Sequence, residues 1–483
     1  MSIVHWLTWS TDAFARARAD DKPVLLSIAA SWCETCRLMD DTTYADPAVA
    51  ALVNESFVPI RVDADRRPDI GERYSLGGWP TTAFLTADGA ILGGGTYVPL
   101  ERMAAVLVRV VDAFRSRQGE ISAGSSAAAT ASRATPESAN ADLAAVVFST
   151  FDEEHGGFGG QPKFPLTAPL DLALASFRQF DDRRMAHVVE ATLDAMGWGQ
   201  LYDEIDGGFF RCAMTRDWQQ PRREKLLDVN AQLLRVYVDA AAALNAARYR
   251  ERAEGILRYV QTWLADPVDG GWGGSQQGDS AYYERSPEAR AGATAPPVDH
   301  VLYASCNAAM VSSALHAAEV FDDVALGEFA LRSLERVVVA CYRPGAGVAH
   351  YVDGEPRVRG LLDDQISMAA ANLDAHAATG NIVYEMMAQE LAHYAIRTMW
   401  DDEEGGFFDR ADAEAHERIG LMRNRLKPFI GNCDAARVLR RLAATGGDHD
   451  FGRRADETLA AMAPLASSQG PLAAHYLLAT MGS

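Results

Sequence analysis

Apolar and polar positions follow two different patterns along the 483-residue chain. Up to about residue 115, short apolar runs bounded by turn residues predict strands at 22–31, 57–63, 81–85 and 91–97. Two stretches with helical periodicity accompany them, at 37–53 and 101–114. Strands and helices that alternate within ~110 residues are typical of a small α/β sandwich.

The stretch 116–140 is rich in Ser, Ala and Gly and nearly free of large apolar residues, which predicts a linker. From 141 onward the periodicity is helical. We therefore expect an α/β domain over 1–115, a linker over 116–140 and an all-helical domain over 141–483. About twelve helical stretches are predicted in the last part, at 141–151, 168–180, 183–201, 226–246, 248–265, 300–321, 323–341, 361–378, 381–399, 432–444, 450–463 and 470–481.

One motif recurs between alternate helical stretches: acidic residues, then Gly-Gly, then an aromatic residue. Its copies lie at 152–160, 203–210, 266–274 and 401–409, with a degenerate copy at 343–354. Repetition at this period indicates stacked helical hairpins. Six hairpins suit a closed (α/α)6 toroid with the motif loops on one rim, and an open solenoid is the alternative. A purely architectural role of these loops is favoured over a functional one.

Charge and cysteine content narrow the classes of function. The net charge is −21, which argues against nucleic acid or an anionic membrane as the main partner. No apolar run approaches the ~18 residues of a membrane span, and the first residues do not resemble a signal peptide, so a cytoplasmic location is the default expectation. Four widely spaced cysteines fit buried apolar positions, and we expect no metal site and no cofactor; they are Cys212, Cys306, Cys341 and Cys433.

The other two cysteines, Cys33 and Cys36, follow a predicted buried strand and open a predicted helix. Unpaired N–H groups and the positive end of the helix dipole stabilise a thiolate at such a position. Cys33 is expected to be the more exposed and to act as the nucleophile, and Cys36 to resolve the mixed disulfide. Trp32 directly precedes the pair and is a further site candidate.

This part of the chain resembles a thioredoxin domain, in which a cis-proline lies against the dithiol, and Pro80 in the run Gly77–Thr82 matches that proline. Nearly the whole chain resembles the spermatogenesis-associated protein 20 family, whose bacterial members are called YyaL-like. The resemblance implies a thioredoxin-like domain joined to an (α/α)6 barrel of the six-hairpin glycosidase type. The matching runs include residues 54–70, 78–89, 156–165, 206–211, 224–234 and 362–365.

Barrels of this shape in sugar hydrolases and epimerases hold acids in a central funnel, so the resemblance makes acids and lysines of the motif-like segments candidates for a pocket. Glu224 and Asp228 are four residues apart, which predicts a shared helix face that is either a site or solvated. Three of the four lysines lie in such segments and either line one pocket or lie there by chance. The candidates are Lys163, Asp206, Glu224, Lys225, Asp228, Asp363 and Asp364, with His155 and His350 beside them.

Three functions are compatible with these patterns. The leading hypothesis is a thiol–disulfide oxidoreductase that acts on a protein thiol or disulfide partner or takes electrons from a donor, with a barrel that binds the partner or a small ligand. The first alternative is a carbohydrate-active barrel, a hydrolase or epimerase with a sugar-like ligand, regulated by the thioredoxin-like domain. The second alternative is a non-catalytic binding scaffold.

Overall fold

The computed structural model describes residues 4–116, 136–412, 418–446 and 450–481, which form two compact units. The first unit, here called the thioredoxin-like unit, comprises residues 1–131 together with 412–425. The second, the helical unit, comprises 132–411 and 426–483. Most of the predicted linker, 117–135, lies outside the described residues, and helix α6 (Pro136–Ser149) already begins within its last part.

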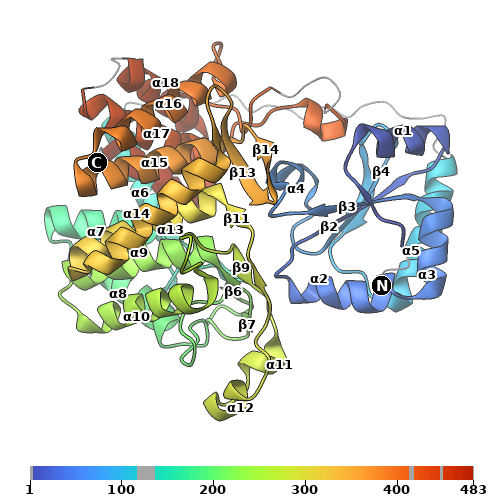
Figure 1. The fold of residues 1–483 in the computed structure, drawn as a ribbon, viewed down its shortest axis with the longest axis horizontal. Helices are drawn as coiled ribbons and strands as arrows, with labels where there is room; N and C mark the ends of the chain where they lie inside the picture. Colours follow the sequence, from blue (N-terminus) through green and yellow to red (C-terminus); the bar gives the residue numbers. More distant parts are fainter. Residues whose placement is uncertain (1–3, 117–135, 413–417, 447–449, 482–483) are drawn as a thin grey trace. The chain divides into compact units, whose positions relative to one another are not determined.

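The thioredoxin-like unit is built on a five-stranded sheet in the order β1-β3-β2-β4-β5 (Figure 1). Strands β1, β3 and β2 are parallel, and β4 and β5 continue the sheet in antiparallel fashion. The central strand β2 is apolar except for Ser27, and all of its residues but Ala29 are buried. The strands are β1 (Leu7–Thr8), β2 (Val24–Ala29), β3 (Val58–Asp63), β4 (Thr81–Leu85) and β5 (Ile91–Gly95).

The helical stretch predicted over 37–53 is two elements instead of one. Helix α2 (Glu34–Met39) runs into a π-helical turn at Asp40–Tyr44, and α3 (Pro47–Ser56) then starts anew. The break has a local cause, because Asp46 is extended, its carboxylate accepts the N–H groups of residues 48 and 49, and proline opens the new helix. The other helices are α1 (Thr11–Ala19), α4 (Pro68–Tyr74) and α5 (Leu100–Ser116).

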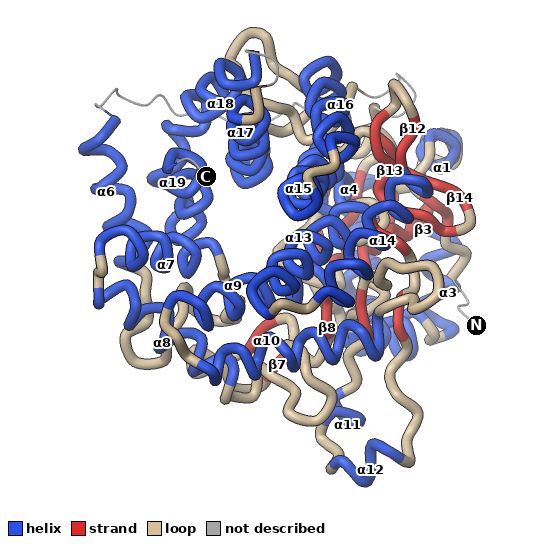
Figure 2. The backbone as a smooth tube through the Cα atoms, turned by 60° about the vertical axis from the view of Figure 1, so that its left-hand side comes forward, coloured by secondary structure: helices blue, strands red, loops and turns tan. Residues whose placement is uncertain are grey.

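The helical unit is a closed ring of helices (Figure 2). Among the described residues, six inner helices contact each other in the order α7, α9, α13, α15, α17, α19, and α19 returns to α7. They are α7 (Ala168–Phe180), α9 (Leu227–Ala243), α13 (Ala304–Phe321), α15 (Leu362–Thr379), α17 (Phe429–Ala444) and α19 (Ala474–Met481). Closure confirms the (α/α)6 toroid over the open solenoid.

Six outer helices back this ring and alternate with the inner ones along the chain. They are α6, α8 (Arg183–Gly197), α10 (Ala247–Tyr259, extended by a π-turn to Leu264), α14 (Val324–Cys341), α16 (Ile382–Met399) and α18 (Asp450–Ala466). The helix bounds follow side-chain caps: Asp182, Asp323 and Asn381 accept backbone N–H groups at the starts of α8, α14 and α16.

The connections from outer to inner helices carry short strands and small helices. Their strands form a two-stranded sheet (β6-β7), a three-stranded sheet (β10-β9-β8) and a four-stranded sheet (β11-β13-β12, with β14 paired to β13). The elements are β6 (Cys212–Ala213), β7 (Pro221–Arg222), β8 (Lys225–Leu226), β9 (Ser275–Gln276), α11 (Ser280–Tyr283), α12 (Pro287–Ala291), β10 (Val298–Asp299), β11 (Leu302–Tyr303), β12 (Tyr342–Arg343), β13 (Gly347–Asp353) and β14 (Glu355–Arg359), together with 3-10 turns at Gly420–Arg423 and Ser467–Ala473.

The four Gly-Gly-aromatic copies form the same tight hairpin. In each, the N–H of the leading aspartate donates to the second glycine's carbonyl, and the first glycine's N–H donates back to the aspartate's carbonyl. Both glycines have positive φ, which residues with a Cβ rarely adopt. Since every copy follows an outer helix and precedes an inner one, all four lie at the end of the ring where the inner helices begin, as predicted. The leading aspartates are Asp152, Asp203, Asp266 and Asp401.

A buried amide ties three of these hairpins to the inner helix that follows. Asn230 on α9, Asn307 on α13 and Asn432 on α17 each accept from and donate to the backbone of the hairpin's aromatic residue. Gln365 on α15 does the same for Val348 of the degenerate copy. All four amides are fully buried, so these bonds satisfy backbone groups that water cannot reach.

Candidate functional site

The dithiol lies where strand β2 ends and helix α2 begins. Cys33 is the N-cap residue of α2, and its Sγ accepts the backbone N–H of Cys36 at 3.1 Å. The two cysteines form a disulfide, with their Cα atoms 5.2 Å apart. The expectation that Cys33 is the more exposed is wrong for this oxidised form, because both residues are only 3% exposed.

Pro80 lies beside the end of β2. Because Thr81 pairs with Ile28 in the antiparallel β2–β4 ladder, the residue before it faces the end of β2 from which the chain continues to Cys33. The Trp79–Pro80 peptide bond is cis. Trp32 is buried, with 4% of its surface exposed. The catalytic roles of Trp32, Cys33, Cys36 and Pro80 remain predictions.

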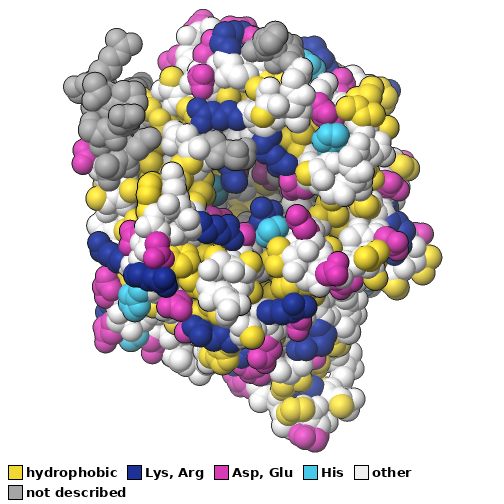
Figure 3. Space-filling model, turned by 90° about the vertical axis from the view of Figure 1, so that its left-hand side faces the viewer, with side chains coloured by type: hydrophobic (Ala, Val, Ile, Leu, Met, Phe, Trp, Pro, Cys, Tyr) yellow, Lys and Arg dark blue, Asp and Glu magenta, His cyan; other side chains and the backbone are white. Residues whose placement is uncertain are grey.

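A second candidate site is the lumen of the helical ring. A cavity of about 550 Å³ lies where the inner helices begin, and one of about 790 Å³ lies toward their C-terminal ends. The two are continuous, since they share lining residues that include Asp171, Asp434 and Arg437. Figure 3 shows a hollow in the surface of the helical unit with basic and acidic side chains around it.

Two lumen carboxyls ionise less readily than usual. Burial raises the pKa of Asp171 to about 6, and the charge of Asp239 adds to the effect. Removal from water likewise raises the pKa of Asp363 to about 6, and the negative charge of the neighbouring Asp364 adds to the effect. Because α7 and α15 are three places apart in a ring of six, Asp171 and Asp363 lie on opposite walls of the lumen.

Other charges in the lumen are paired within the protein. Asp239 binds Arg178 at 2.7 Å and His316 at 3.3 Å, and these partners outweigh burial and lower its pKa. Arg441 pairs with Asp374 at 2.6 Å. Arg437 lines the same cavity as Asp171, and its positive charge favours the ionised form of that carboxyl. The lumen therefore contains both side chains that donate hydrogen bonds and carboxyls with a raised pKa.

Of the sequence-predicted pocket residues, Asp228 and Asp363 line the smaller cavity. The lysines lie elsewhere: Lys163 pairs with Asp152 at 2.8 Å and Lys225 with Asp203 at 2.7 Å. Lys427 pairs with the equivalent aspartate of the fourth hairpin at 2.6 Å. Each lysine thus holds the leading aspartate of its own hairpin, and the three do not share one pocket.

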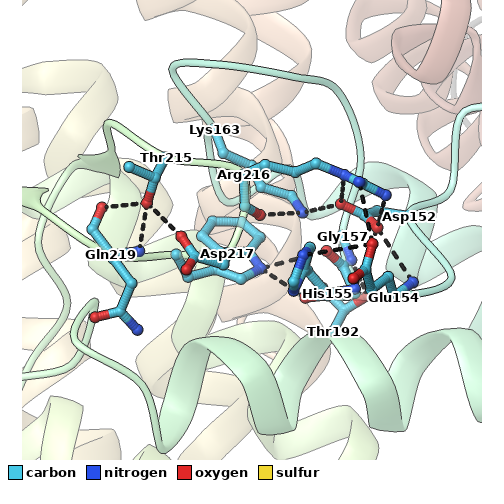
Figure 4. A network of polar contacts seen from close by, with 12 residues as sticks. Asp152, Glu154, His155, Gly157, Lys163, Thr192, Thr215, Arg216, Asp217 and Gln219 are labelled. Carbon is cyan, nitrogen blue, oxygen red and sulfur yellow. Dashed lines mark hydrogen bonds and ion pairs between the residues drawn. The ribbon is translucent and has the colours of Figure 1, made fainter.

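Figure 4 shows the first of these pairs in its setting. Arg216 clamps both oxygens of Asp152 at 2.7 and 2.8 Å while Lys163 approaches one of them, and these cations outweigh burial and lower the pKa of the carboxyl. His155, a predicted neighbour of the pocket, lies in this hairpin beside Glu154 at 3.6 Å. The network is complete within the protein, which favours an architectural role.

The remaining predicted residues lie outside the two cavities. Asp206 binds Arg290 at 2.8 Å, and the buried Asp364 binds His350 Nδ1 at 3.0 Å. Glu224 is 2% exposed and 3.7 Å from Arg211. Its expected sharing of a helix face with Asp228 is wrong, because α9 starts only at Leu227 and the preceding residues form strand β8.

Sequence reasoning missed the lumen residues Asp171, Asp434 and Arg437. A signal was present, since both aspartates lie within the first two turns of apolar inner helices, as Asp228 and Asp363 do. These four acids recur at the start of inner helices, and all four line the smaller cavity. That pattern could have been found without the structure.

Comparison with known proteins agrees with this architecture. Residues 1–132 match the family named Thioredox_DsbH, described as "Protein of unknown function, DUF255". Thioredoxin-1 of Drosophila melanogaster is 31% identical over 93 residues, which are 19% of this chain and 84% of that protein. Through this N-terminal region the chain belongs to the thioredoxin family.

More of the chain matches a longer protein. Spermatogenesis-associated protein 20 of Mus musculus is 31% identical over 308 residues, 57% of this chain and 39% of that relative. The match confirms the predicted resemblance, and it spans about two-fifths of the relative's length. No helix in the described ranges is long and apolar enough to cross a membrane.

The helical unit has solved structural neighbours. The cellobiose 2-epimerase from Bacillus thermoamylovorans B4167 superposes with a TM-score of 0.54 at 10% identity, covering 67% of this chain and 86% of the epimerase. At this identity the likeness defines the fold, a six-hairpin (α/α)6 barrel, and no more.

Proposed function

We propose that the chain is a thiol–disulfide oxidoreductase whose Cys33–Cys36 pair exchanges with a protein disulfide or dithiol. The observation that carries the proposal is the position of Cys33 as the N-cap of α2, with its sulfur accepting a backbone N–H. A thiol whose sulfur accepts a hydrogen bond at a helix start loses its proton more readily than a free cysteine, whose pKa is about 8.5. Pro80, which directly precedes β4, would offer an extended peptide substrate a place to lie beside the pair.

In the reducing direction, the Cys33 thiolate attacks one sulfur of the substrate disulfide and forms a mixed disulfide, while the other substrate sulfur leaves as a thiolate. Cys36 then attacks Cys33 Sγ and releases the second substrate thiol. The enzyme pair is oxidised by two electrons and the substrate reduced by two, and an external dithiol returns the pair to the reduced form. Oxidation of a substrate dithiol is the same sequence in reverse.

The other cysteines support this assignment by contrast. Burial raises the pKa of Cys341 to about 12 and also raises the pKa of Cys212 and Cys433. These thiols are therefore poor nucleophiles near neutral pH. These three buried thiols are therefore less suited to exchange than a cysteine at the start of α2.

The test is reduction of a fluorescent disulfide-linked peptide with dithiothreitol as the electron donor. Cys33→Ser is expected to abolish turnover, and Cys36→Ser to accumulate a mixed disulfide that mass spectrometry detects. Cys341→Ser is the matched control, since it removes a buried thiol elsewhere, and it should retain parental turnover. Full turnover by Cys33→Ser contradicts the proposal.

A second candidate function is binding or turnover of a small polyhydroxylated ligand, such as a sugar, in the lumen. The observation in its favour is the pair Asp171 and Asp363, whose carboxyls ionise near pH 6 on opposite walls of one cavity. Carboxyls of this kind hold or accept a proton near neutral pH, as hydrolases and epimerases require. If the chain has both of these functions, the helical unit binds a ligand or partner and the dithiol carries out the exchange.

Thermal-shift screening with mono- and disaccharides tests this second function. A stabilising sugar should lose its effect in Asp171→Asn and Asp363→Asn but keep it in Glu335→Gln, a change on outer helix α14. No shift with any sugar, together with an inert dithiol, would favour the non-catalytic scaffold instead.

A further inference from the structure

A short piece of the chain from late in the sequence is part of the thioredoxin-like unit. Residues Ile419–Asn424, here called the docked segment, lie between α16 and α17 in sequence, yet they pack with α4. The segment contains a 3-10 turn at Gly420–Arg423. Ile419 and Met422 are buried in the unit, with 9% and 2% of their surfaces exposed.

Tyr74, the last residue of α4, is the centre of the docking. Its hydroxyl accepts the N–H of Leu421 and donates to the carbonyl of Gly89, each at 2.8 Å. The side chain is fully buried, and burial raises its pKa to about 12. One hydroxyl therefore joins the docked segment, the turn before β5 and the end of α4 by directional bonds that water does not replace.

Two further contacts fix the segment in place. Arg73 donates from Nη2 and Nε to the carbonyl of Asn424, at 2.8 and 3.2 Å. Gly420 has φ +54°, and a Cβ there would clash with the Tyr74 hydroxyl and the Gly89 carbonyl. The two glycine backbones thus meet directly, and only glycine fits at either position.

The docked segment is connected to the dithiol site through α4. Tyr74 ends this helix, and the chain runs on through five residues, 75–79, to the cis bond before Pro80. That loop has its own bonds, since Thr81 Oγ1 accepts the N–H of Leu76 and donates to the carbonyl of Gly78. Because Tyr74 holds the end of α4 in place, it also fixes the point from which the loop to Pro80 starts.

We propose that the docked segment is a built-in brace of the thioredoxin-like unit and that Tyr74 is a positioning residue for the dithiol site. It holds the end of α4, and through it the Trp79–Pro80 loop, in the geometry in which Cys33 and Cys36 exchange. The inference deepens the proposed oxidoreductase function and rests on it for its meaning. It also makes the redox unit dependent on residues more than 300 positions away from the dithiol.

The test uses the full chain with Tyr74→Phe and, separately, Gly420→Ala. Gly380→Ala is the matched control, since that glycine has φ +68° and an added Cβ meets no atom within 4 Å. Hydrogen exchange of the Leu421 amide should accelerate at least about tenfold in both variants, in line with the loss of a buried bond. The equilibrium constant of the Cys33–Cys36 pair with glutathione, and the rate of Cys33 alkylation against pH, should each change several-fold, whereas the control should match the parent.

Each outcome decides a separate claim. Unchanged Leu421 exchange in both variants overturns the docking role of Tyr74. Faster exchange with a parental glutathione equilibrium and parental alkylation profile overturns positioning and leaves a merely structural contact. If the parent turns over no disulfide substrate but the variants still shift the glutathione equilibrium, the proposed oxidoreductase function fails while the brace stands. Gly420→Ala keeps the test usable if Tyr74→Phe does not fold.

Discussion

Lys225 donates a hydrogen bond of 2.7 Å from Nζ to Asp203 Oδ2, and both side chains are almost completely buried, at 0% and 2% exposed. Burial lowers the pKa of this lysine to about 8, while the aspartate opposes the change. The ammonium also donates to the Gly207 carbonyl at 2.7 Å and lies 4.4 Å from the centre of the Tyr259 ring. Together with Arg290, the lysine thus neutralises the buried aspartate of its hairpin, which favours a structural role.

Lys225→Met should therefore destabilise the helical unit strongly. The change leaves Asp203 buried with Arg290 as its remaining cation. Leaving a buried charge with no partner costs about 3–5 kcal/mol, so this range is the upper limit of the expected loss. Urea denaturation followed by tryptophan fluorescence measures the free energy of unfolding. The matched control is Lys427→Met in the fourth hairpin, whose pair is 18% and 14% exposed and should cost less. Equal losses in the two variants would contradict the burial argument.

The raised pKa of Asp363 should make the thermal stability of the chain depend on pH. Its pKa in the folded chain, about 6, is above the unfolded value of about 3.9, so folding favours the protonated form and stability from this group is lost as pH rises from about 4 past 6. Asp363→Asn keeps the neutral shape. By scanning calorimetry, we expect this variant to melt higher than the parent at pH 7.5 and to match it at about pH 3, where the carboxyl is protonated in both the folded and the unfolded chain.

Asp239, in the same lumen, should change stability with pH in the opposite direction. Hydrogen bonds from His316 and Arg178 overcome burial and lower its pKa, so its stabilising charge is present above the unfolded value and is lost as pH falls through the folded one. Asp239→Asn should melt lower than the parent at pH 7.5, with a smaller deficit at pH 3.5. The same trend in both variants would refute the assigned electrostatics.

The sequence carried the local part of this structure. Helices such as α7 and α16 match their predicted bounds within a residue, because apolar periodicity and N-caps such as Asn381 are encoded in adjacent positions. The dithiol was predictable for the same reason. Its chemistry depends on a strand, two cysteines and a helix start that follow one another directly.

The parts that were not predicted depend on contacts between distant positions. Nothing local to Lys163 indicates that its partner is Asp152 and not a ligand, and the opposition of Asp171 to Asp363 exists only once the ring closes. The docked segment is the extreme case, because Tyr74 and Leu421 meet across 347 positions. Spacing and periodicity describe one element at a time and do not report such pairs.

Thiol reactivity should rank the cysteines of the reduced, folded chain. A short pulse of iodoacetamide at pH 7.5 is expected to label Cys33 first, and to leave Cys341 and Cys433 unlabelled because burial raises the pKa of both thiols. Peptide mass spectrometry reads the labelled positions. Labelling in urea is the control, in which the cysteines should react alike. Native labelling of Cys341 as fast as Cys33 would contradict the ranking.

The buried side-chain amides of the inner helices should contribute more to the free energy of unfolding than exposed amides do. Asn432 accepts the Phe407 N–H at 2.6 Å and donates to the Phe407 and Pro428 carbonyls at 2.9 and 2.8 Å. Asn432→Leu keeps the size but leaves the Phe407 N–H and carbonyl buried without that partner, at a cost of about 1–3 kcal/mol for each unsatisfied group.

The comparison variant is Asn381→Ala, which removes an exposed N-cap at the start of α16 and should cost about 1 kcal/mol. Urea denaturation gives both free energies, and hydrogen exchange of the Phe407 amide reports the local effect. We expect faster exchange of that amide in Asn432→Leu alone. If Asn381→Ala destabilises the helical unit as much as Asn432→Leu does, the hairpins are held by packing of their aromatic rings, and the amides only fill space.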